Sequence, residues 1–266
     1  MGASRSLILA AALTGLGLVL TQPVAADERE ARIDWGQRYT VSAPLAGIVR
    51  EISIQPGDRV TEGQTLFTLD TRRLRADARA GEAERERLHL ELAEADREVE
   101  RAEELYDRTL IALRELELSR IQRAMAAARL ARADAELQKT RVDLEDSVVR
   151  APAAGRILSV TVSMGEAVSP ALAPAVLAVL GSTDPMRAET TVDADTAGRL
   201  QPGQPARVRL DTGEAFDGSV ASVGWQVEDI GFGDGYRLAV HFSAPETARL
   251  RAGQSARVSL PAVADE

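Results

Sequence analysis

The chain of 266 residues contains no cysteine, only 3% aromatic residues and only two histidines. Without cysteine, disulfides, thiol catalysis, thiolate metal sites and lipid attachment at an amino-terminal cysteine are all excluded. So few aromatic side chains suit paired Ala/Leu helices and small β-modules better than a large enzyme core built around a pocket. The net charge of -9 and the pI near 5.0 argue against nucleic acid as a partner, because nucleic acid selects basic faces.

Residues that would support catalysis or metal binding are equally scarce. His89 falls in a charged helical segment and His241 in an expected strand, so the two lack ligand spacing. The glycine-rich stretch 230–236 lacks the lysine and the following helix of a phosphate loop, and it reads as a hairpin loop. The four methionines do not cluster. We therefore predict no enzymatic activity, no cofactor and no metal site.

The first 26 residues have the form of an export signal. Arg5 supplies the positive start, residues 7–20 form an apolar run, and Val24-Ala25-Ala26 is a small-residue cleavage site. An uncleaved anchor is the alternative, because residues 7–26 approach the length of a spanning helix, although Thr21, Gln22 and Pro23 weaken it. We predict cleavage after Ala26 and export of the rest of the chain.

A long helical segment, residues 71–146, organises the rest of the chain. It is rich in Ala, Leu, Glu and Arg, contains no proline, and has Gly81 as its single glycine. Small or apolar residues recur at steps of three and four in two arms, which is typical of a coiled-coil seam. The seam residues are Ala78, Gly81, Leu88, Leu92, Ala95, Val99, Ala102 and Tyr106 in the first arm, and Leu116, Ala126, Leu130, Ala133, Leu137, Thr140 and Leu144 in the second. Arg85 is the one break. We predict an antiparallel hairpin with its turn at residues 109–112 and a length of roughly 54 Å.

The second arm also carries a second apolar stripe. Its members are Ile121, Met125, Ala128, Ala135 and Val142. Either this stripe contacts a neighbouring subunit, or it belongs to a seam that is merely broad.

Two copies of one motif flank the helical segment at an offset of 108 residues. Both copies contain Ala-Pro-x-Ala-Gly, at 43–47 and at 151–155, and the register continues through seven matches. The matches are Ala43/Ala151, Pro44/Pro152, Gly47/Gly155, Gly57/Gly165, Asp58/Glu166, Val60/Val168 and Leu69/Leu177. Each copy reads as short strands broken by Pro and Gly turns. Because neither copy can bury its apolar face alone, we predict two half-sheets stacked face to face as a sandwich.

A second repeat lies in the strand-rich carboxyl-terminal part. Residues 199–210 return as residues 249–260, an offset of 50, and each copy reads as a short helix, a Gly turn and a strand. Short strands over about 75 residues fit a small β-barrel. The charged stretch 27–38 reads as a leader into the first strand.

Taken together, the split repeat, the hairpin, the barrel and the export signal resemble the periplasmic adaptor family, also called membrane fusion proteins or the HlyD-like family. The resemblance covers residues 39–260. It implies a mainly β fold with a long α-helical coiled-coil hairpin, in which a lipoyl-like barrel-sandwich hybrid is split by the hairpin and followed by a small β-barrel. The expected divisions are a signal peptide (1–26), a leader (27–38), the lipoyl-like domain (39–70 and 148–181), the hairpin (71–147), the barrel (185–261) and a tail (262–266).

The resemblance also implies function. A family adaptor is a periplasmic ring of subunits, here a trimer or hexamer, that links an inner-membrane transporter of the resistance-nodulation-division or ATP-driven type to an outer-membrane channel. The hairpin tip docks on that channel. The family tip pattern Arg-x3-Leu-x6-Ser falls on Arg101, Leu105 and Ala112, which keeps two positions and replaces the serine. With Arg108 in the turn, these residues are the expected partner-binding site. Family members often add a membrane-proximal domain, and without one the transporter contact is expected to use the barrel, the leader or both.

Two other function classes are weighed against the adaptor. A biotin or lipoate carrier has the same two half-motifs but presents a modified lysine between them, whereas Lys139, in the second arm, is the only lysine here. That reading is nearly excluded. The other alternative is an exported coiled-coil scaffold without a transport role.

Overall fold

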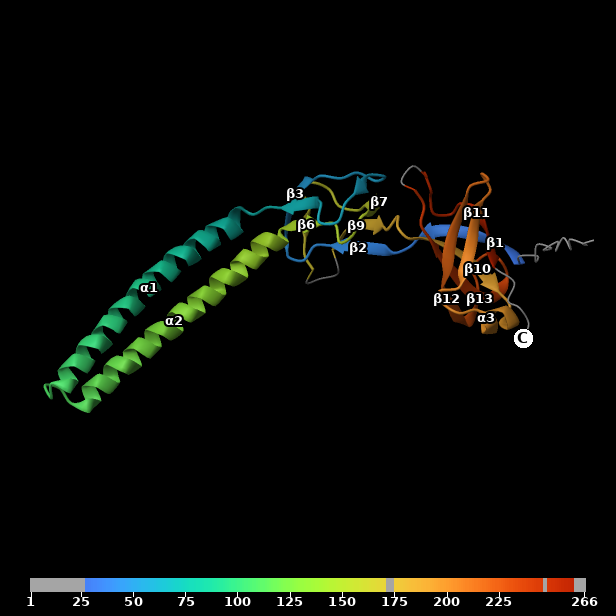
Figure 1. The fold of residues 1–266 in the computed structure, drawn as a ribbon. Coiled ribbons are helices and arrows are strands. Elements are labelled where there is room, and N and C mark those ends of the chain that lie inside the picture. The colour runs from blue at the N-terminus through green and yellow to red at the C-terminus, as the bar shows by residue number, and fades with distance from the viewer. Residues whose placement is uncertain (1–26, 171–174, 246–247, 261–266) are drawn as a thin grey trace, which may run out of the picture. The chain divides into compact units, whose positions relative to one another are not determined.

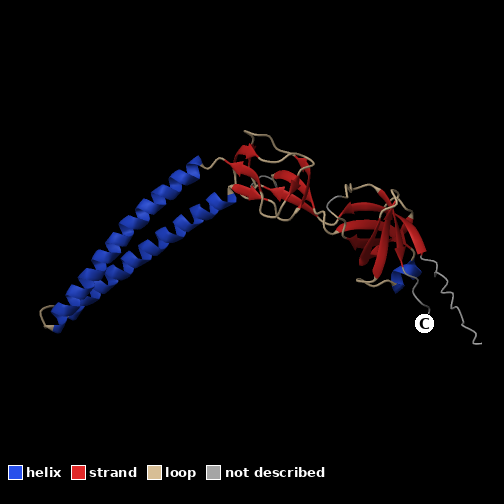
Figure 2. Ribbon diagram, turned by 45° about the horizontal axis from the view of Figure 1, so that its top comes forward, coloured by secondary structure: helices blue, strands red, loops and turns tan. Residues whose placement is uncertain are grey.

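The computed structural model describes residues 27–170, 175–245 and 248–260, which form a mainly β protein with two long helices (Figures 1 and 2). The predicted signal peptide and tail lie outside the described residues. The chain divides into two compact units. The hairpin unit consists of the described residues within 33–188 and 241–254. The barrel unit is built from residues 27–32, 189–240 and 255–260.

The hairpin unit contains a sandwich of two four-stranded sheets. One sheet has the order β2-β9-β7-β4 and the other the order β6-β5-β3-β8. The strands are β2 (Arg38–Ser42), β3 (Gly47–Ile52), β4 (Arg59–Val60), β5 (Thr65–Leu69), β6 (Val148–Arg150), β7 (Gly155–Val160), β8 (Ala167–Val168) and β9 (Val176–Gly181).

Each sheet takes two strands from each copy of the repeat, so the predicted stacking of two self-contained half-sheets is wrong. The strands β2 and β4 of the first copy pair with β9 and β7 of the second, and the other sheet repeats this arrangement with the copies exchanged. Reciprocal hydrogen bonds express the same symmetry. Gly57 N donates to Ile157 O at 2.8 Å, and Gly165 N donates to Val49 O at 2.7 Å. The copies interlock because β2, β4, β6 and β8 have their ladder partner in the other copy, while β7–β9 and β3–β5 pair within one copy.

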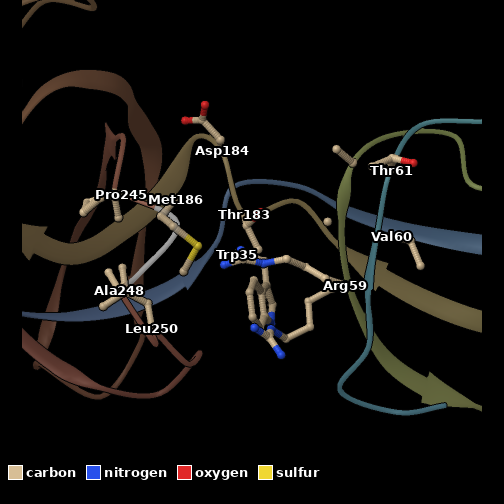
Figure 3. A pocket seen from close by; sticks show the side chains of 14 residues that line it. Trp35, Arg59, Val60, Thr61, Thr183, Asp184, Met186, Pro245, Ala248 and Leu250 are labelled. Atoms are coloured by element: carbon tan, nitrogen blue, oxygen red, sulfur yellow. The ribbon is translucent and has the colours of Figure 1, made fainter. Parts of the chain in front are cut away.

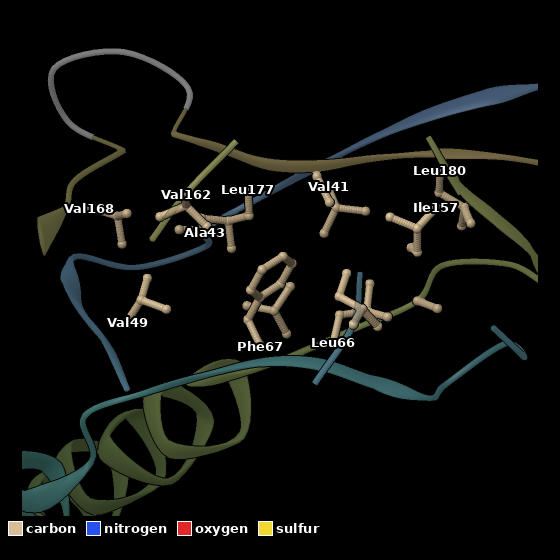
Figure 4. Packing of buried hydrophobic residues seen from close by; sticks show 14 of the residues in the cluster. Val41, Ala43, Val49, Leu66, Phe67, Ile157, Val162, Val168, Leu177 and Leu180 are labelled. Carbon is tan, nitrogen blue, oxygen red and sulfur yellow. The ribbon is translucent and has the colours of Figure 1, made fainter. Parts of the chain in front are cut away.

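The core of the sandwich preserves the 108-residue repeat. Six pairs of buried residues are related by that offset. They are Val41/Val149, Ala43/Ala151, Val49/Ile157, Ile54/Val162, Val60/Val168 and Leu69/Leu177. Figure 4 shows side chains from both sheets pointing toward one another around Phe67, which is fully buried. The repeat therefore marks the positions that the two copies must bury together.

One type of glycine turn recurs five times among the described residues. In each turn the glycine has a φ between 76° and 96°, and the side chain after it accepts a hydrogen bond from a backbone N–H three residues earlier. The glycines are Gly57, Gly63, Gly165, Gly203 and Gly253. Asp, Gln and Glu all serve as the acceptor, so Gly followed by one of these residues is the local signal for the turn.

The two long helices are α1 (Arg72–Asp107) and α2 (Leu113–Asp146), and they leave the sandwich together at one end (Figure 1). Their sequences contain mostly good helix formers, and no proline interrupts them. The chain reverses in residues 108–112, where Thr109 takes a positive φ of 62°. The antiparallel hairpin is thus observed, with the turn close to the predicted residues.

The barrel closes in the order β1-β10-β13-β12-β11-β14. Its elements are β1 (Asp27–Trp35), β10 (Met186–Val192), the short helix α3 (Ala194–Arg199), β11 (Pro205–Leu210), β12 (Ala215–Asp229), β13 (Asp234–Phe242) and β14 (Ser255–Leu260). The loop 230–233 joins β12 to β13, as the glycine-rich stretch predicted.

Two expectations about the barrel are wrong. Residues 27–35 are a strand paired with β14 and not a leader, because Ala31, Ile33 and Trp35 alternate and are all buried. Because charged residues lie between these three, the two-residue alternation of a strand is not evident from the sequence. In addition, α3 precedes the turn of the first repeat copy, whereas residues 248–254 before β14 contain no helix.

Candidate functional site

Small and apolar residues line the contact between α1 and α2. Ala78, Leu88 and Ala102 of α1 are buried, as are Leu116, Ala126, Ala133 and Leu137 of α2. At Gly81 the helices approach closely, because a Cβ placed there would lie 3.2 Å from Leu137 Cδ1. Most of the predicted seam is therefore correct. Near the tip it shifts by one residue, since Tyr106 is 39% exposed while Leu105 is half-buried.

Five ion pairs link the two arms among the described residues. They are Arg85–Asp134 at 2.7 Å, Arg141–Glu82 at 3.1 Å, Arg129–Glu91 at 2.5 Å, Arg123–Asp96 at 2.6 Å and Arg120–Glu103 at 2.7 Å. Their side chains are about one-third to over one-half exposed, so each contributes at most about 1 kcal/mol. Together they fix the register of the arms and hence which residues reach the tip. Arg85, the break in the predicted seam, is one of these links.

Hydrogen bonds within the turn hold the tip in a defined conformation. Thr109 N donates to Tyr106 O at 2.8 Å, and Leu110 N donates to Leu105 O at 2.9 Å. This conformation leaves Leu110 66% exposed and Leu113 49% exposed. Two leucines at a solvent-exposed helix turn have no role in the seam, so they are candidates for contact with a partner.

The structure places the four predicted tip residues as follows. Arg101 is exposed and forms an ion pair with Glu98 at 2.7 Å. Leu105 is half-buried in the seam, whereas Arg108 and Ala112 are exposed. Ala112 is the residue that precedes α2, with φ -78° and ψ 152°, and no side chain caps the helix there. Sequence reasoning missed Leu110 and Leu113, although a large apolar residue inside a polar turn is a readable signal.

The second apolar stripe of α2 faces solvent. Ile121 is 55% exposed, Met125 52% and Val142 42%, and Leu118 extends the stripe at 47%. A broad seam would have buried these side chains against α1, so that alternative is excluded. The stripe is free to contact another molecule.

A pocket of about 350 Å³ in the hairpin unit is lined by 14 residues, among them Trp35, Arg59, Arg156 and Asp184 (Figure 3). Arg156 Nη1 donates to Gly57 O at 2.5 Å, so this guanidinium supports the turn that contains Gly57. Among the described residues of the lining, Asp184 is the only carboxylate, and there is no histidine or lysine. The pocket therefore lacks a pair of groups for general acid–base chemistry.

A hydrogen-bonded charge pair lies where α1 begins. The Arg72 guanidinium and the Arg72 backbone N–H both donate to the carboxylate of Asp70 and lower the pKa of Asp70 to about 2. In the barrel unit, Asp193 accepts from Thr196 N at 2.9 Å and begins α3, and these bonds lower its pKa as well. Asp193 is the N-cap of α3, and Asp70 lies two residues before α1 and accepts from its first residue, so both lowered pKa values have a structural cause.

No other feature of the described residues points to catalysis. His89 is exposed on α1 and His241 is half-buried in β13. Within the described ranges no three His, Cys, Asp or Glu side chains are grouped so that they could hold a metal ion. Over the same ranges, no helix is long and apolar enough to cross a membrane, because α1 and α2 are rich in charge. Lys139 is exposed on α2 and so lies on a helix, not on a turn between strands.

Comparison with known proteins gives a consistent picture. Residues 37–179 match the model of the CzcB-like, barrel-sandwich hybrid domain. The nickel-cobalt-cadmium resistance protein NccB of Alcaligenes xylosoxydans is 28% identical over 211 residues, which cover 79% of this chain and 50% of NccB. The macrolide export protein MacA of Escherichia coli is 22% identical over 189 residues, 66% of this chain and 51% of MacA. The chain thus spans about half the length of these relatives.

A solved structure has a similar fold over most of the chain. The membrane fusion protein Spr0693 of Streptococcus pneumoniae superposes with a TM-score of 0.68, at 18% identity, and covers 88% of this chain and 97% of that one. At this identity the similarity speaks for the fold alone.

Proposed function

Because the chain belongs to the membrane fusion, or periplasmic adaptor, family of efflux and secretion systems, which is non-catalytic, we propose that it links an inner-membrane transporter to an outer-membrane channel. In this proposal the chain lies in the periplasm after cleavage of its signal peptide, and it is held at the inner membrane by a transporter of the resistance-nodulation-division or ATP-driven type. The α1–α2 hairpin reaches the channel with its tip.

The exposed apolar tip is the observation that carries this proposal. Leu110 and Leu113 lie closer to the tip than the last buried seam residues, Ala102 and Leu116. They therefore contribute little buried apolar area to the stability of the free protein. On a channel surface they would bury apolar area, and the nearby Arg101 guanidinium would donate to carbonyl or carboxylate oxygens. Leu105 supports the tip from within the seam.

Variants of the tip test the proposal in the native host, with the chromosomal copy deleted. Sensitivity to nickel, cobalt, cadmium and macrolides would be measured, because relatives are named for resistance to these compounds or for their export. Arg101→Asp and Leu110→Asp are expected to abolish protection while shifting the free energy of unfolding by less than about 0.5 kcal/mol. Leu90→Asp is the matched control, since Leu90 is 61% exposed in the middle of α1.

Ala112→Ser supplies a change in the opposite direction. A serine at this position would cap α2, worth about 0.5 to 1 kcal/mol, and would restore the third residue of the family tip pattern. Export is expected to be held or improved. Unchanged protection in both aspartate variants, with full expression, would mean that the hairpin does not dock by its tip.

Self-association accounts for the exposed stripe on α2. In a ring of three or six copies, the stripe of Leu118, Ile121, Met125 and Val142 would pack against the neighbouring hairpin. Sedimentation analysis of the mature protein tests this, with Ile121→Glu expected to shift the oligomer toward monomer.

An exported coiled-coil scaffold without a transport role remains the second candidate, because it too would need a long, charged hairpin. Copurification separates the two candidates. An adaptor is expected to retain a transporter from detergent-solubilised inner membranes, and a scaffold is not.

A further inference from the structure

Trp225 has the largest exposed fraction of any large apolar side chain in the described part of the chain, 96%. Val227, two residues further along β12, is 58% exposed. Because alternate residues of a strand point to one face, the two side chains form a single apolar patch, here called the Trp225 patch. Tryptophan contributes more binding area than other side chains, and large aromatic anchors dominate many protein interfaces.

The strand that carries the patch is held in place by its neighbours. Arg237 donates two hydrogen bonds to Glu228, at 3.1 and 2.7 Å, and so ties β13 to β12 beside Val227. In the loop that joins β12 to β13, the Phe232 ring lies under the Arg32 guanidinium. The guanidinium is 5.6 Å from the centre of the ring, a cation–π contact. The patch is thus presented on a fixed strand, which lowers the entropy cost of binding.

Two exposed carboxylates lie beside the patch and restrict what can cover it, whereas Glu228 falls on the other strand face and is paired with Arg237. Asp229 lies two residues beyond Val227 and so shares its strand face, and Asp234 begins the opposing strand. An anionic bilayer surface would be repelled by these groups. A protein surface with an apolar socket and an arginine or lysine rim would be complementary to them.

We propose that the Trp225 patch anchors the barrel unit to a protein partner that offers an apolar socket with a cationic rim. This inference rests on the proposed function, in which that partner is the inner-membrane transporter. It assigns the transporter contact to a strand of the barrel and gives the hairpin tip no part in it.

Binding of the mature protein to inner-membrane vesicles from the native host tests the inference. Sedimentation would be measured with intact vesicles, with protease-treated vesicles and with liposomes made from the extracted lipids. Wild-type protein is expected to bind only the intact vesicles. Trp225→Ala should weaken this binding by about 30-fold or more, and Trp225→Phe should restore part of it. Leu90→Ala is the control, because Leu90 is an exposed apolar residue in the hairpin unit.

The alternatives give different results. The melting temperature of Trp225→Ala is expected to equal that of the wild-type protein, because a side chain that is 96% exposed has few contacts to lose. Equal binding to liposomes would identify a lipid surface, and self-association lost in Trp225→Ala would identify a second copy; either result overturns the inference. If Trp225→Ala binds intact vesicles as tightly as wild type, the inference is wrong and the adaptor function stands. If wild-type protein shows no protease-sensitive binding at all, both are wrong.

Discussion

Gly47 and Gly155 occupy equivalent positions in the repeat, yet replacement by alanine should destabilise the protein at Gly155 far more than at Gly47. A Cβ at Gly155 would lie 2.3 Å from the backbone oxygen of Gly181, roughly 1 Å inside ordinary contact. At Gly47 the nearest atoms would be Leu69 Cβ and Cδ1, both at an ordinary 3.5 Å. The first contact is with backbone of the paired strand β9, so β7 and β9 must separate or shift. We expect Gly155→Ala to destabilise the protein by about 3 kcal/mol and Gly47→Ala to change stability by less than about 1 kcal/mol.

Urea unfolding followed by tryptophan fluorescence measures this difference. Trp35 is 6% exposed and packs on Gly181, so its emission reports the region that Gly155→Ala disturbs. With a urea m-value of about 2 kcal/mol/M, the midpoint should fall by about 1.5 M in Gly155→Ala and stay within about 0.5 M in Gly47→Ala. Circular dichroism at helical wavelengths controls for loss of the hairpin. Equal midpoints for the two variants would refute the reasoning, because they would show that the close contact of a Cβ at position 155 with Gly181 does not determine the loss of stability.

Three further outcomes are expected. Excision of residues 71–147 and closure with a short Gly/Ser turn should leave a β protein with a cooperative unfolding transition. The reason is that Thr68 already pairs with Val148, so a short turn can join the two strands. A broad, non-cooperative transition would mean that the sandwich depends on the hairpin. The Asp70 carboxylate has a folded-state pKa of about 2, below its unfolded value, so its contribution to stability is present above about pH 4 and lost as pH falls toward 2. Acid titration of the melting temperature should therefore show a smaller drop over this range in Asp70→Asn, and an identical drop would count against the Asp70–Arg72 interaction. Intact-mass measurement of protein from the periplasm should give a chain that begins at Asp27, and retention of the first 26 residues would show an uncleaved segment.

The sequence allowed the fold class and the hairpin to be predicted because their signals are periodic. Seam residues recur every three or four positions, and the repeat returns after 108 residues with its core positions intact. The interlocking of the two copies could not be read in the same way. A self-similar sequence shows that two units are alike, but only backbone pairing decides whether each unit forms its own sheet or shares both.

Local exceptions were harder to predict than periods. Charged residues separate Ala31, Ile33 and Trp35, so the sequence favours a leader over residues 27–38, although all three are buried in β1. At the hairpin tip the spacing predicts Tyr106 as a seam residue, while the structure partly buries Leu105 instead. Near Asp107 the helix ends and the chain turns, so steps of three and four no longer specify which side chain faces the partner helix.

Exposure is the property that separates the candidate binding residues from the rest of the chain, and exposure is the least readable property of a sequence. Leu110, Leu113 and Trp225 are ordinary apolar residues in the sequence, and only the structure shows that no side chain of the described residues covers them. The family pattern pointed to Arg101 and Leu105, of which the first is solvated and the second partly serves the seam. Large apolar side chains that are exposed on ordered turns and strands can stabilise a complex when a partner buries them. They are therefore better sites for mutagenesis than residues chosen by pattern alone.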